Sequence, residues 1–249
     1  MGHNVLITGA SSGIGQGLAR AWVKRGAKVW GVARRETELK ALEQETFGAV
    51  VPVVFDVSDA DALAAKLLEL DEASGGFDVA VANAGIGGPT PVATTPWSEV
   101  APILEVNVLG AAATLHTLAG RMVQRGKGRL CGIASLAAYR GFWAHGPYNG
   151  SKAFVSMYLE SLRIELVGTG VTATCVYPGI VKTAINARLK KPPSFSIEVP
   201  EAAEIIVSAV ERGERRVAFP RVHAMSMRMT QLLPDMVWEP IASRTTRGG

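Results

Sequence analysis

The chain has 249 residues, of which 48% are hydrophobic and 19% charged, with a formal net charge of +4. This length fits one α/β domain with a large core, and the dispersed basic residues offer no Lys/Arg run for nucleic-acid binding. The two cysteines, Cys131 and Cys175, favour reduced core thiols over a disulfide framework or a metal site. The chain leads directly into a strand pattern without a signal peptide, and no apolar run reaches membrane-spanning length, so we expect a soluble, cytoplasmic protein.

Short apolar segments alternate along the chain with longer segments of helical periodicity. Strands are predicted at Asn4–Thr8, Lys28–Val32, Val50–Phe55, Val79–Ala82, Arg129–Ile133, Thr172–Val176 and Arg216–Phe219. Helices are predicted at Ile14–Arg25, Glu36–Glu45, Asp59–Ala73, Trp97–Arg125, Tyr148–Val167 and Pro200–Arg212. Several strand segments are continuously apolar, as in strands covered on both faces. The pattern predicts a single-domain, Rossmann-type α/β fold: a doubly wound parallel sheet of about seven strands flanked by helices.

A glycine-rich turn separates the first predicted strand from the first helix. It reads Thr8, Gly9, Ala10, Ser11, Ser12, Gly13, Ile14, Gly15. At such a turn a phosphate can approach bare backbone N–H groups at the positive end of a helix. A tight turn without a ligand is the alternative, but the strand–turn–helix context favours a dinucleotide site.

The second strand is followed by two arginines where many dinucleotide sites have an acid. An acidic residue there binds the free 2′-hydroxyl of the adenosine ribose. Arg34 and Arg35 can instead pair with a 2′-phosphate. We therefore predict NADP(H) over NAD(H), with Arg34 as the main phosphate contact, although either arginine could simply be solvated.

Polar and small residues follow the third and fourth strands. Asp56, which precedes Val57, can reach the adenine amine or cap the next helix. Asn83 can tie neighbouring strands together, and the small residues Ala84 and Gly85 let a cofactor pass close to the chain. An ordinary Asn–Gly turn is the alternative.

Three further features point to the same edge of the sheet. Asn107 is polar within an apolar helix and must be hydrogen-bonded, either around a water that kinks the helix or to backbone. Ser135 follows the fifth strand, at the carboxyl edge where such folds bind ligands. The sixth strand is followed at that edge by Pro178, Gly179, Ile180 and Thr183.

Tyr148 and Lys152 lie four residues apart, which places both on one face of a helix. An ammonium near a phenol favours the phenolate, so we expect the pKa of Tyr148 to fall toward neutrality. Such a tyrosine can give or take a proton. A packed ring beside a solvated charge is the alternative.

Together these residues resemble the classical short-chain dehydrogenase/reductase family. TGxxxGxG, Asn-Ala-Gly, the helix Asn, the Ser, YxxxK and Pro-Gly-x-x-x-Thr occur in family order between Val5 and Phe219. Ala82 departs from the family, in which many members have a second Asn at that position.

The resemblance implies a role for each residue of the site. Tyr148 would be the general acid/base, and Lys152 would bind the nicotinamide ribose and lower the Tyr148 pKa. Ser135 would hold the substrate oxygen, and Asn107 would position a water that links Lys152 to solvent. Thr183, with the backbone after Pro178, would fix the carboxamide.

We therefore predict an NADP(H)-dependent oxidoreductase that transfers hydride between nicotinamide and a carbonyl or secondary alcohol substrate, without a metal ion. Two alternatives remain. One is a non-catalytic nucleotide-binding or sensing protein on the same fold. The other is a membrane-associated ketoreductase of lipid metabolism.

The resemblance places a substrate loop at 184–200, and aromatic and apolar side chains fall where the family's cleft forms. These are Tyr139, Phe142, Trp143, Ile180 and Phe195, and they favour an apolar substrate. His145 can line the pocket or be solvated. His116 and His223 have no evident partner.

The C-terminal segment 221–249 lies outside these motifs. Val222, Met225, Met229, Leu232, Leu233 and Met236 recur at helical spacing and favour core or subunit packing over membrane docking. The family implies a homodimer or homotetramer paired through the helices Trp97–Arg125 and Tyr148–Val167.

Overall fold

The fold is known from a computed structural model, which describes residues 3–183 and 195–245. Most of the predicted substrate loop, residues 184–194, and the chain end, 246–249, lie outside the described residues.

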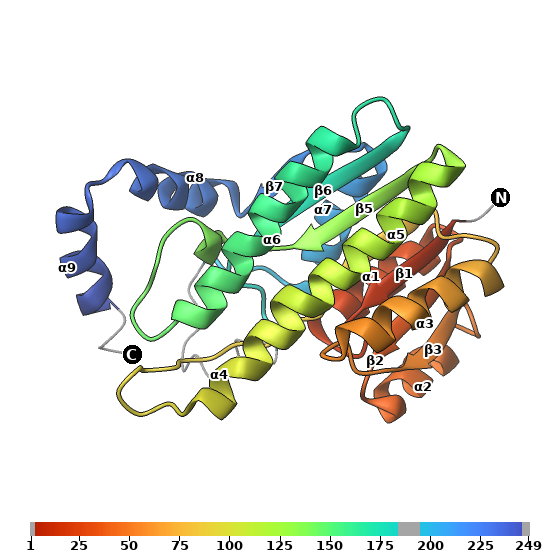
Figure 1. The fold of residues 1–249 in the computed structure, drawn as a ribbon, viewed down its shortest axis with the longest axis horizontal. Coiled ribbons are helices and arrows are strands. Elements are labelled where there is room, and N and C mark those ends of the chain that lie inside the picture. The colour runs from red at the N-terminus through yellow and green to blue at the C-terminus, as the bar shows by residue number, and fades with distance from the viewer. Residues whose placement is uncertain (1–2, 184–194, 246–249) are drawn as a thin grey trace.

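A seven-stranded sheet in the order β3-β2-β1-β4-β5-β6-β7 forms the centre of the molecule (Figure 1). All neighbouring strands pair in parallel. The strands are β1 Asn4–Thr8, β2 Lys28–Ala33, β3 Val50–Val54, β4 Val79–Ala82, β5 Gly128–Ile133, β6 Val171–Pro178 and β7 Arg216–Phe219. The predicted doubly wound parallel sheet is confirmed, and strand order reverses direction between β1 and β4.

Helices cover both faces of the sheet, which explains why its strands are continuously apolar. Side chains from α3, α5 and α6 pack on one face, and side chains from α1, α2 and α7 pack on the other. The helices are α1 Gly13–Lys24, α2 Glu36–Glu45, α3 Ala60–Ala73, α4 Trp97–Leu104, α5 Ala111–Arg125, α6 Gly146–Glu165, α7 Val199–Glu211, α8 Arg221–Met229 and α9 Asp235–Thr245.

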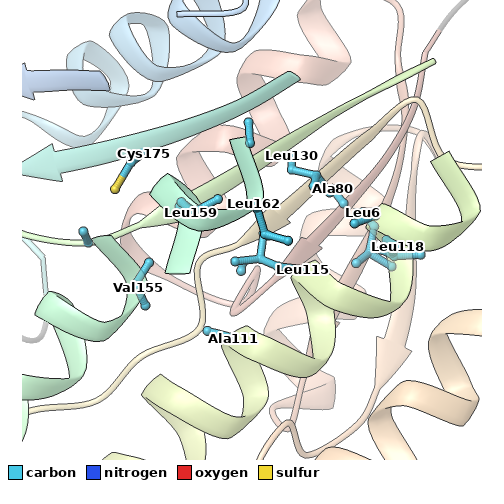
Figure 2. Close-up of a cluster of buried hydrophobic side chains, with 14 of the residues drawn as sticks. Leu6, Ala80, Ala111, Leu115, Leu118, Leu130, Val155, Leu159, Leu162 and Cys175 are labelled. Atoms are coloured by element: carbon cyan, nitrogen blue, oxygen red, sulfur yellow. The ribbon is translucent and has the colours of Figure 1, made fainter. Parts of the chain in front are cut away.

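The core beneath α5 and α6 fixes these two helices on the sheet. Figure 2 shows Leu115 and Leu118 of α5 and Leu159 of α6 among side chains of the central strands. All three leucines are fully buried. Each contributes about 1.5–3 kcal/mol by leaving water. This packing holds the start of α6, which carries Tyr148 and Lys152, against the carboxyl end of β5.

The segment Trp97–Arg125 differs from the single helix that the sequence predicts. A π-helical turn, Glu105–Gly110, separates α4 from α5. By length and composition the segment could cross a membrane, with 29 residues and a mean hydropathy of 1.3, which corrects the expectation that no run is long enough. Half of the 18-residue window with this hydropathy is buried inside the fold, as expected for a core helix.

The C-terminal helices α8 and α9 lie outside the sheet layers, next to the loop that precedes α6 (Figure 1). The apolar stripe predicted here points outward: Val222, Met225, Met229, Leu232 and Met236 are all exposed. The prediction that these side chains pack into the chain's own core is therefore wrong for all five, because each of them is exposed.

Candidate active site

A cavity of about 610 Å³ opens at the carboxyl ends of the strands. It is lined by nearly all the residues that the sequence singles out. These are Gly9, Ser11, Ser12, Gly13, Ile14, Arg34, Arg35, Asp56, Val57, Asn83, Ala84, Gly85, Ser135, Tyr148, Lys152, Pro178, Gly179, Ile180 and Thr183. Of the catalytic and cofactor-binding residues predicted from the sequence, Gly15 and Asn107 are not among the lining residues.

The glycine-rich turn is held by contacts that leave no room for side chains. Gly9 has a φ of +71° and donates from its N–H to Val32 O at 2.8 Å. A Cβ on Gly9 would lie 2.8 Å from Ala84 Cα, and one on Gly15 would collide with the Gly9 carbonyl. Gly15 therefore supports the turn from behind, and the turn presents bare backbone to the cavity at the start of α1.

Asn83 ties β4 to β1, which confirms that prediction. Its Nδ2 donates to Thr8 O at 2.9 Å, and Thr8 Oγ1 accepts from the N–H groups of Asn83 and Ala84 at 3.1 Å each. These bonds fix the strand ends at the point where sheet order reverses, which is where doubly wound folds bind ligands.

Arg35 and Arg34 lie at the far end of the cavity in different surroundings. Arg35 Nη2 donates to Ser11 Oγ at 2.9 Å and to Ser12 Oγ at 2.6 Å. Arg34 Nη1 lies 3.5 Å from Asp56 Oδ2, and its side chain is 64% exposed. A pair of guanidinium groups and two hydroxyls thus meets at one end of the glycine-rich turn.

Asp56 is not the cap of the following helix. Its Oδ1 accepts from Ser58 N at 3.0 Å, whereas Asp59 caps α3 by accepting from Ala62 N at 3.0 Å. Burial pushes the pKa of Asp56 upward, but the Ser58 hydrogen bonds and Arg34 outweigh it and leave that pKa below its ordinary value. The carboxylate is therefore ionised and shared with Arg34.

Asn107 is hydrogen-bonded to the backbone of Ile86 and to the Ser151 side chain. Its Oδ1 accepts from Ile86 N at 2.8 Å, and its Nδ2 donates to Ile86 O at 2.9 Å. Nδ2 also donates to Ser151 Oγ at 3.0 Å. The side chain projects from the π-helical turn and fixes the chain that follows β4 against α6.

Ser135, Tyr148 and Lys152 converge on the middle of the cavity. Ser135 Oγ accepts from Ala137 N at 3.1 Å at the start of a short 3₁₀ turn, Leu136–Ala138. Lys152 Nζ donates to Ile133 O at 2.9 Å and lies 5.8 Å from the Tyr148 ring centroid. The ammonium thus faces the ring from one turn farther along α6, as the spacing predicts.

The pKa of Tyr148 differs from the sequence-based expectation. Burial raises the pKa of the phenol, and the Ser135 hydroxyl offsets only part of that rise. The expected fall toward neutrality is therefore wrong for this geometry. Lys152 does not lower it because its ammonium points to the Ile133 carbonyl, and because burial lowers the pKa of Lys152 itself to about 8.

The segment after β6 closes the cavity on the side of the glycine-rich turn. Gly179 N donates to Phe219 O at 2.7 Å, which fixes the backbone at the end of β6. A Cβ on Gly13 would lie 3.2 Å from Thr183 Cγ2. The start of α1 and the Thr183 side chain are thus in near contact across the cavity.

The lining also includes residues that were not predicted for the site, among them His223 and Met227 of α8. These two lie four residues apart, on the face of α8 opposite its exposed stripe, and no local motif marks them. His223 stacks on Phe195 with ring centroids 4.5 Å apart. Burial lowers the pKa of His223, so the ring is neutral at pH 7.

The aromatic and apolar residues predicted for the cleft divide into two groups. Phe142 and Ile180 line the cavity. Tyr139 instead stacks on Tyr177, with centroids 5.1 Å apart. Trp143 is not among the lining residues, and the ring of His145 is bonded to the Trp143 carbonyl outside the cavity.

These residues fit a dinucleotide. Gly9 and Gly13 leave the backbone of the turn bare, Lys152 supplies ammonium donors, and Arg34 and Arg35 supply cationic ones. No group of three metal-ligating side chains occurs within residues 3–183 and 195–245. The donor set therefore suits an anionic cofactor.

Comparisons with known proteins agree with this arrangement. A sequence model described as short chain dehydrogenase matches residues 3–194. An uncharacterized oxidoreductase of Myxococcus xanthus is 44% identical over 245 residues, which cover 97% of each chain.

Two solved structures share the fold over most of their length. A short-chain dehydrogenase from Sphingobium yanoikuyae in complex with NADPH is 27% identical, with a TM-score of 0.80 over 94% of this chain and 96% of that one. A 3-ketoacyl-(acyl-carrier-protein) reductase from Brucella melitensis complexed with NADH is 26% identical, with a TM-score of 0.80 over 88% of this chain and 98% of that one. The match to the family over 3–194, together with the parallel sheet and the residues gathered in its cavity, shows that this chain belongs to the short-chain dehydrogenase/reductase family of oxidoreductases.

Proposed function

We propose that the protein is an NADP(H)-dependent oxidoreductase that interconverts a carbonyl compound and a secondary alcohol, with Tyr148 as the general acid/base. One observation carries this proposal. Ser135, Tyr148 and Lys152 line the same cavity as the glycine-rich turn and the two arginines. A proton donor, an oxygen-binding hydroxyl and a dinucleotide cradle thus share one enclosed space.

The bound nicotinamide supplies the hydride, and this chain supplies the proton and the orientation. Ser135 Oγ accepts from Ala137 N, and its own proton can be donated to a substrate oxygen beside the Tyr148 phenol. Because burial raises the pKa of Tyr148, the phenol holds its proton at pH 7 and can donate it as charge grows on that oxygen. In oxidation Tyr148 takes the proton back.

Lys152 acts beside them as a fixed cation. One of its N–H groups is used by Ile133 O, and the others are available to the nicotinamide ribose. Asn107 holds the Ile86 backbone and Ser151, so it shapes the wall next to Lys152. A water held between Asn107 and solvent would complete the proton path.

Replacement of the phenol tests the mechanism. Tyr148→Phe is expected to lower kcat at least about a hundredfold, the lower range of a general acid/base contribution. The NADPH dissociation constant should stay within about twofold, because the ring is retained. Tyr158→Phe, on the same helix but outside the cavity, is the matched control. Full turnover in Tyr148→Phe would disprove the role.

The preference for NADP(H) rests on Arg34 and Arg35, since the two solved relatives hold NADPH and NADH respectively. A 2′-phosphate bound to Arg35 would also contact the hydroxyls of Ser11 and Ser12. Arg34, by contrast, is already paired with the Asp56 carboxylate. Both guanidinium groups border the place that a 2′-phosphate would take.

Single substitutions measure each contribution. Arg34→Ala and Arg35→Ala are each expected to weaken NADPH binding about 10- to 100-fold, as charge-assisted hydrogen bonds do, and to leave NADH binding nearly unchanged. Lys40→Ala, on neighbouring α2 outside the cavity, removes the same charge as a control. Equal losses for NADPH and NADH would place the phosphate elsewhere.

The substrate end of the cavity favours an apolar carbonyl compound. Phe142, Ile180 and Met227 line it, and His223 adds a neutral ring. A panel of ketones and aldehydes of increasing size, followed by NADPH fluorescence, identifies the class. A protein that binds NADPH but is inert on the whole panel would favour a nucleotide-sensing role.

Exposed apolar side chains support assembly into a homodimer or homotetramer. Leu109, Met157 and Ile164 are 50%, 64% and 73% exposed and belong to the helical segments that the family pairs. Burial of such side chains between two copies would remove their contact with water.

The outward stripe of α8 favours a second candidate, a membrane-associated ketoreductase. Val222, Met225 and Met229 are exposed there beside Arg221 and Arg228. Co-sedimentation with anionic lipid vesicles, with and without the residues after Phe219, tests it. Protein that stays in the supernatant supports a cytoplasmic enzyme instead.

A further inference from the structure

The loop between β5 and α6 is held by the C-terminal segment through Arg140 and Trp238. Arg140 Nη2 donates to Leu233 O at 2.7 Å, and its Cζ lies 5.6 Å from the Trp238 ring centroid. Trp238 Nε1 in turn donates to Gly141 O at 3.0 Å. The two residues of this last bond are 97 positions apart in sequence, so these contacts join the C-terminal segment to a distant loop.

The arginine side chain of this contact is shielded from solvent, whereas the Trp238–Gly141 hydrogen bond is exposed. The Arg140 side chain is 17% exposed, although its ion-pair partner Asp235 is 81% exposed. The bond to Leu233 O and the stacking on Trp238 therefore matter more than the Arg140–Asp235 pair, which water screens.

The same contact ends at the substrate side of the cavity. The Phe142 and Trp238 rings meet edge to face, with centroids 5.7 Å apart and planes at 76°. Phe142 lines the cavity that contains Ser135 and Tyr148. The Phe142 ring thus lies between Trp238 and the reacting centre, and Trp238 limits how far it can swing away.

The loop is also fixed to the catalytic helix from its other side. Asn149, which is buried and follows Tyr148, donates from Nδ2 to Arg140 O at 3.2 Å. The Arg140 residue therefore bonds to α6 by its carbonyl and to the C-terminal segment by its guanidinium. Its main chain and side chain together connect α9 with the helix that carries Tyr148.

We propose that Arg140 and Trp238 are positioning residues. They hold Phe142 in place, so that its ring forms a rigid wall that bulky, apolar carbonyl substrates contact. The C-terminal segment thereby sets which substrates the site accepts, without touching them itself. This inference rests on the proposed carbonyl-reductase function for its kinetic consequence. The structural clamp itself is independent of any activity.

Hydrogen–deuterium exchange of the free protein tests the clamp. Trp238→Ala removes the indole donor and the ring, so amide exchange in peptides covering 139–145 should accelerate at least about tenfold as local opening becomes easier. Trp238→Phe keeps an aromatic ring but removes the indole donor, so its exchange rate should lie between those of the unaltered protein and Trp238→Ala. Met236→Ala, 80% exposed on the same helix, is the matched control and should match the unaltered protein.

Kinetics with a ketone series from butanone to aryl ketones tests the substrate wall. In Trp238→Ala and Arg140→Ala, KM for aryl ketones should rise about two- to tenfold, the range that an aromatic pair contributes. KM for butanone, kcat and the NADPH dissociation constant should stay within about twofold. Arg140→Lys, which keeps a cation near Trp238, should recover part of the discrimination.

The outcomes separate the two proposals. Unchanged exchange in Trp238→Ala overturns the clamp, whether or not a substrate is found. Faster exchange with unchanged discrimination between aryl ketones and butanone overturns the role of Phe142 as a substrate wall. An unaltered protein that reduces no member of the series overturns the proposed function, while the exchange result still decides the clamp.

Discussion

Lys152 provides a test of the site that needs neither cofactor nor substrate. Its ammonium is buried, and the pKa of Lys152 is lowered from an ordinary 10.5 to about 8 by that burial. A lowered pKa means that the folded state gives up this proton before the unfolded state does. Lys152→Met keeps a long, unbranched side chain, one heavy atom shorter, and removes the titration.

The sign and the size follow from proton linkage. Between pH 8 and pH 10.5 the unfolded chain holds a proton at Lys152 that the folded chain has released, so stability rises with pH in this window. Below pH 8 both the folded and the unfolded chain hold the Lys152 proton, so this group gives no pH dependence of stability there. Each pH unit is worth about 1.4 kcal/mol, so the unfolding free energy of the unaltered protein should gain about 3 kcal/mol over Lys152→Met across the window.

Urea unfolding at several pH values from 7 to 10.5 measures the difference between the two proteins, in which all other titrations cancel. Lys24→Met, at an exposed lysine on α1, is the control for the loss of a lysine outside the site. A flat difference for Lys152→Met would show that its ammonium is not held in an apolar site, and the reasoning would fail.

Three other substitutions probe the rest of the structure. Burial raises the pKa of Asp71, but Arg125 and its other hydrogen-bond donors outweigh it, so the carboxylate stabilises the fold above its ordinary pKa of 3.8. Asp71→Asn should therefore lower the unfolding free energy by about 2–4 kcal/mol in urea at pH 7. The difference from the unaltered protein should become smaller below pH 3.8, and a difference that does not change with pH would contradict this. Gly15→Ala should cost about 1–3 kcal/mol because its Cβ meets the Gly9 carbonyl, and a variant of full stability would show that the turn can shift. Ile164→Glu should lower the mass measured by light scattering to that of a monomer, and an unchanged mass would place the subunit interface elsewhere.

Much of the fold could be predicted because its signals are local. The strands β1, β4 and β7 begin and end as predicted, since continuous apolar segments bounded by polar residues suffice to define buried strands. The residues of the site follow from the same logic, because each motif comes directly after a parallel strand. Parallel strands bring their carboxyl ends to one edge, whatever lies between them in sequence.

The features that were missed depend on contacts between distant segments. The π-helical turn forms where Asn107 meets Ile86, and helical periodicity cannot reveal that partner. The direction of the Tyr148 pKa depends on how deeply the ring is buried, not on the spacing to Lys152. His223 reaches the cavity because α8 begins directly after β7, whose carboxyl end lies at the same edge of the sheet.

The bond pair between Asn107 and Ile86 also restricts its neighbour. Two hydrogen bonds, at 2.8 and 2.9 Å, pair the N–H and C=O of Ile86 with the Asn107 side-chain amide, in the way that a neighbouring strand would pair with them. The chain cannot then retreat from α6 at the next residue. A Cβ on Gly87 would lie 2.5 Å from Tyr148 Cδ2. An asparagine 20 positions away in sequence thus makes position 87 a place where only glycine fits beside the tyrosine ring.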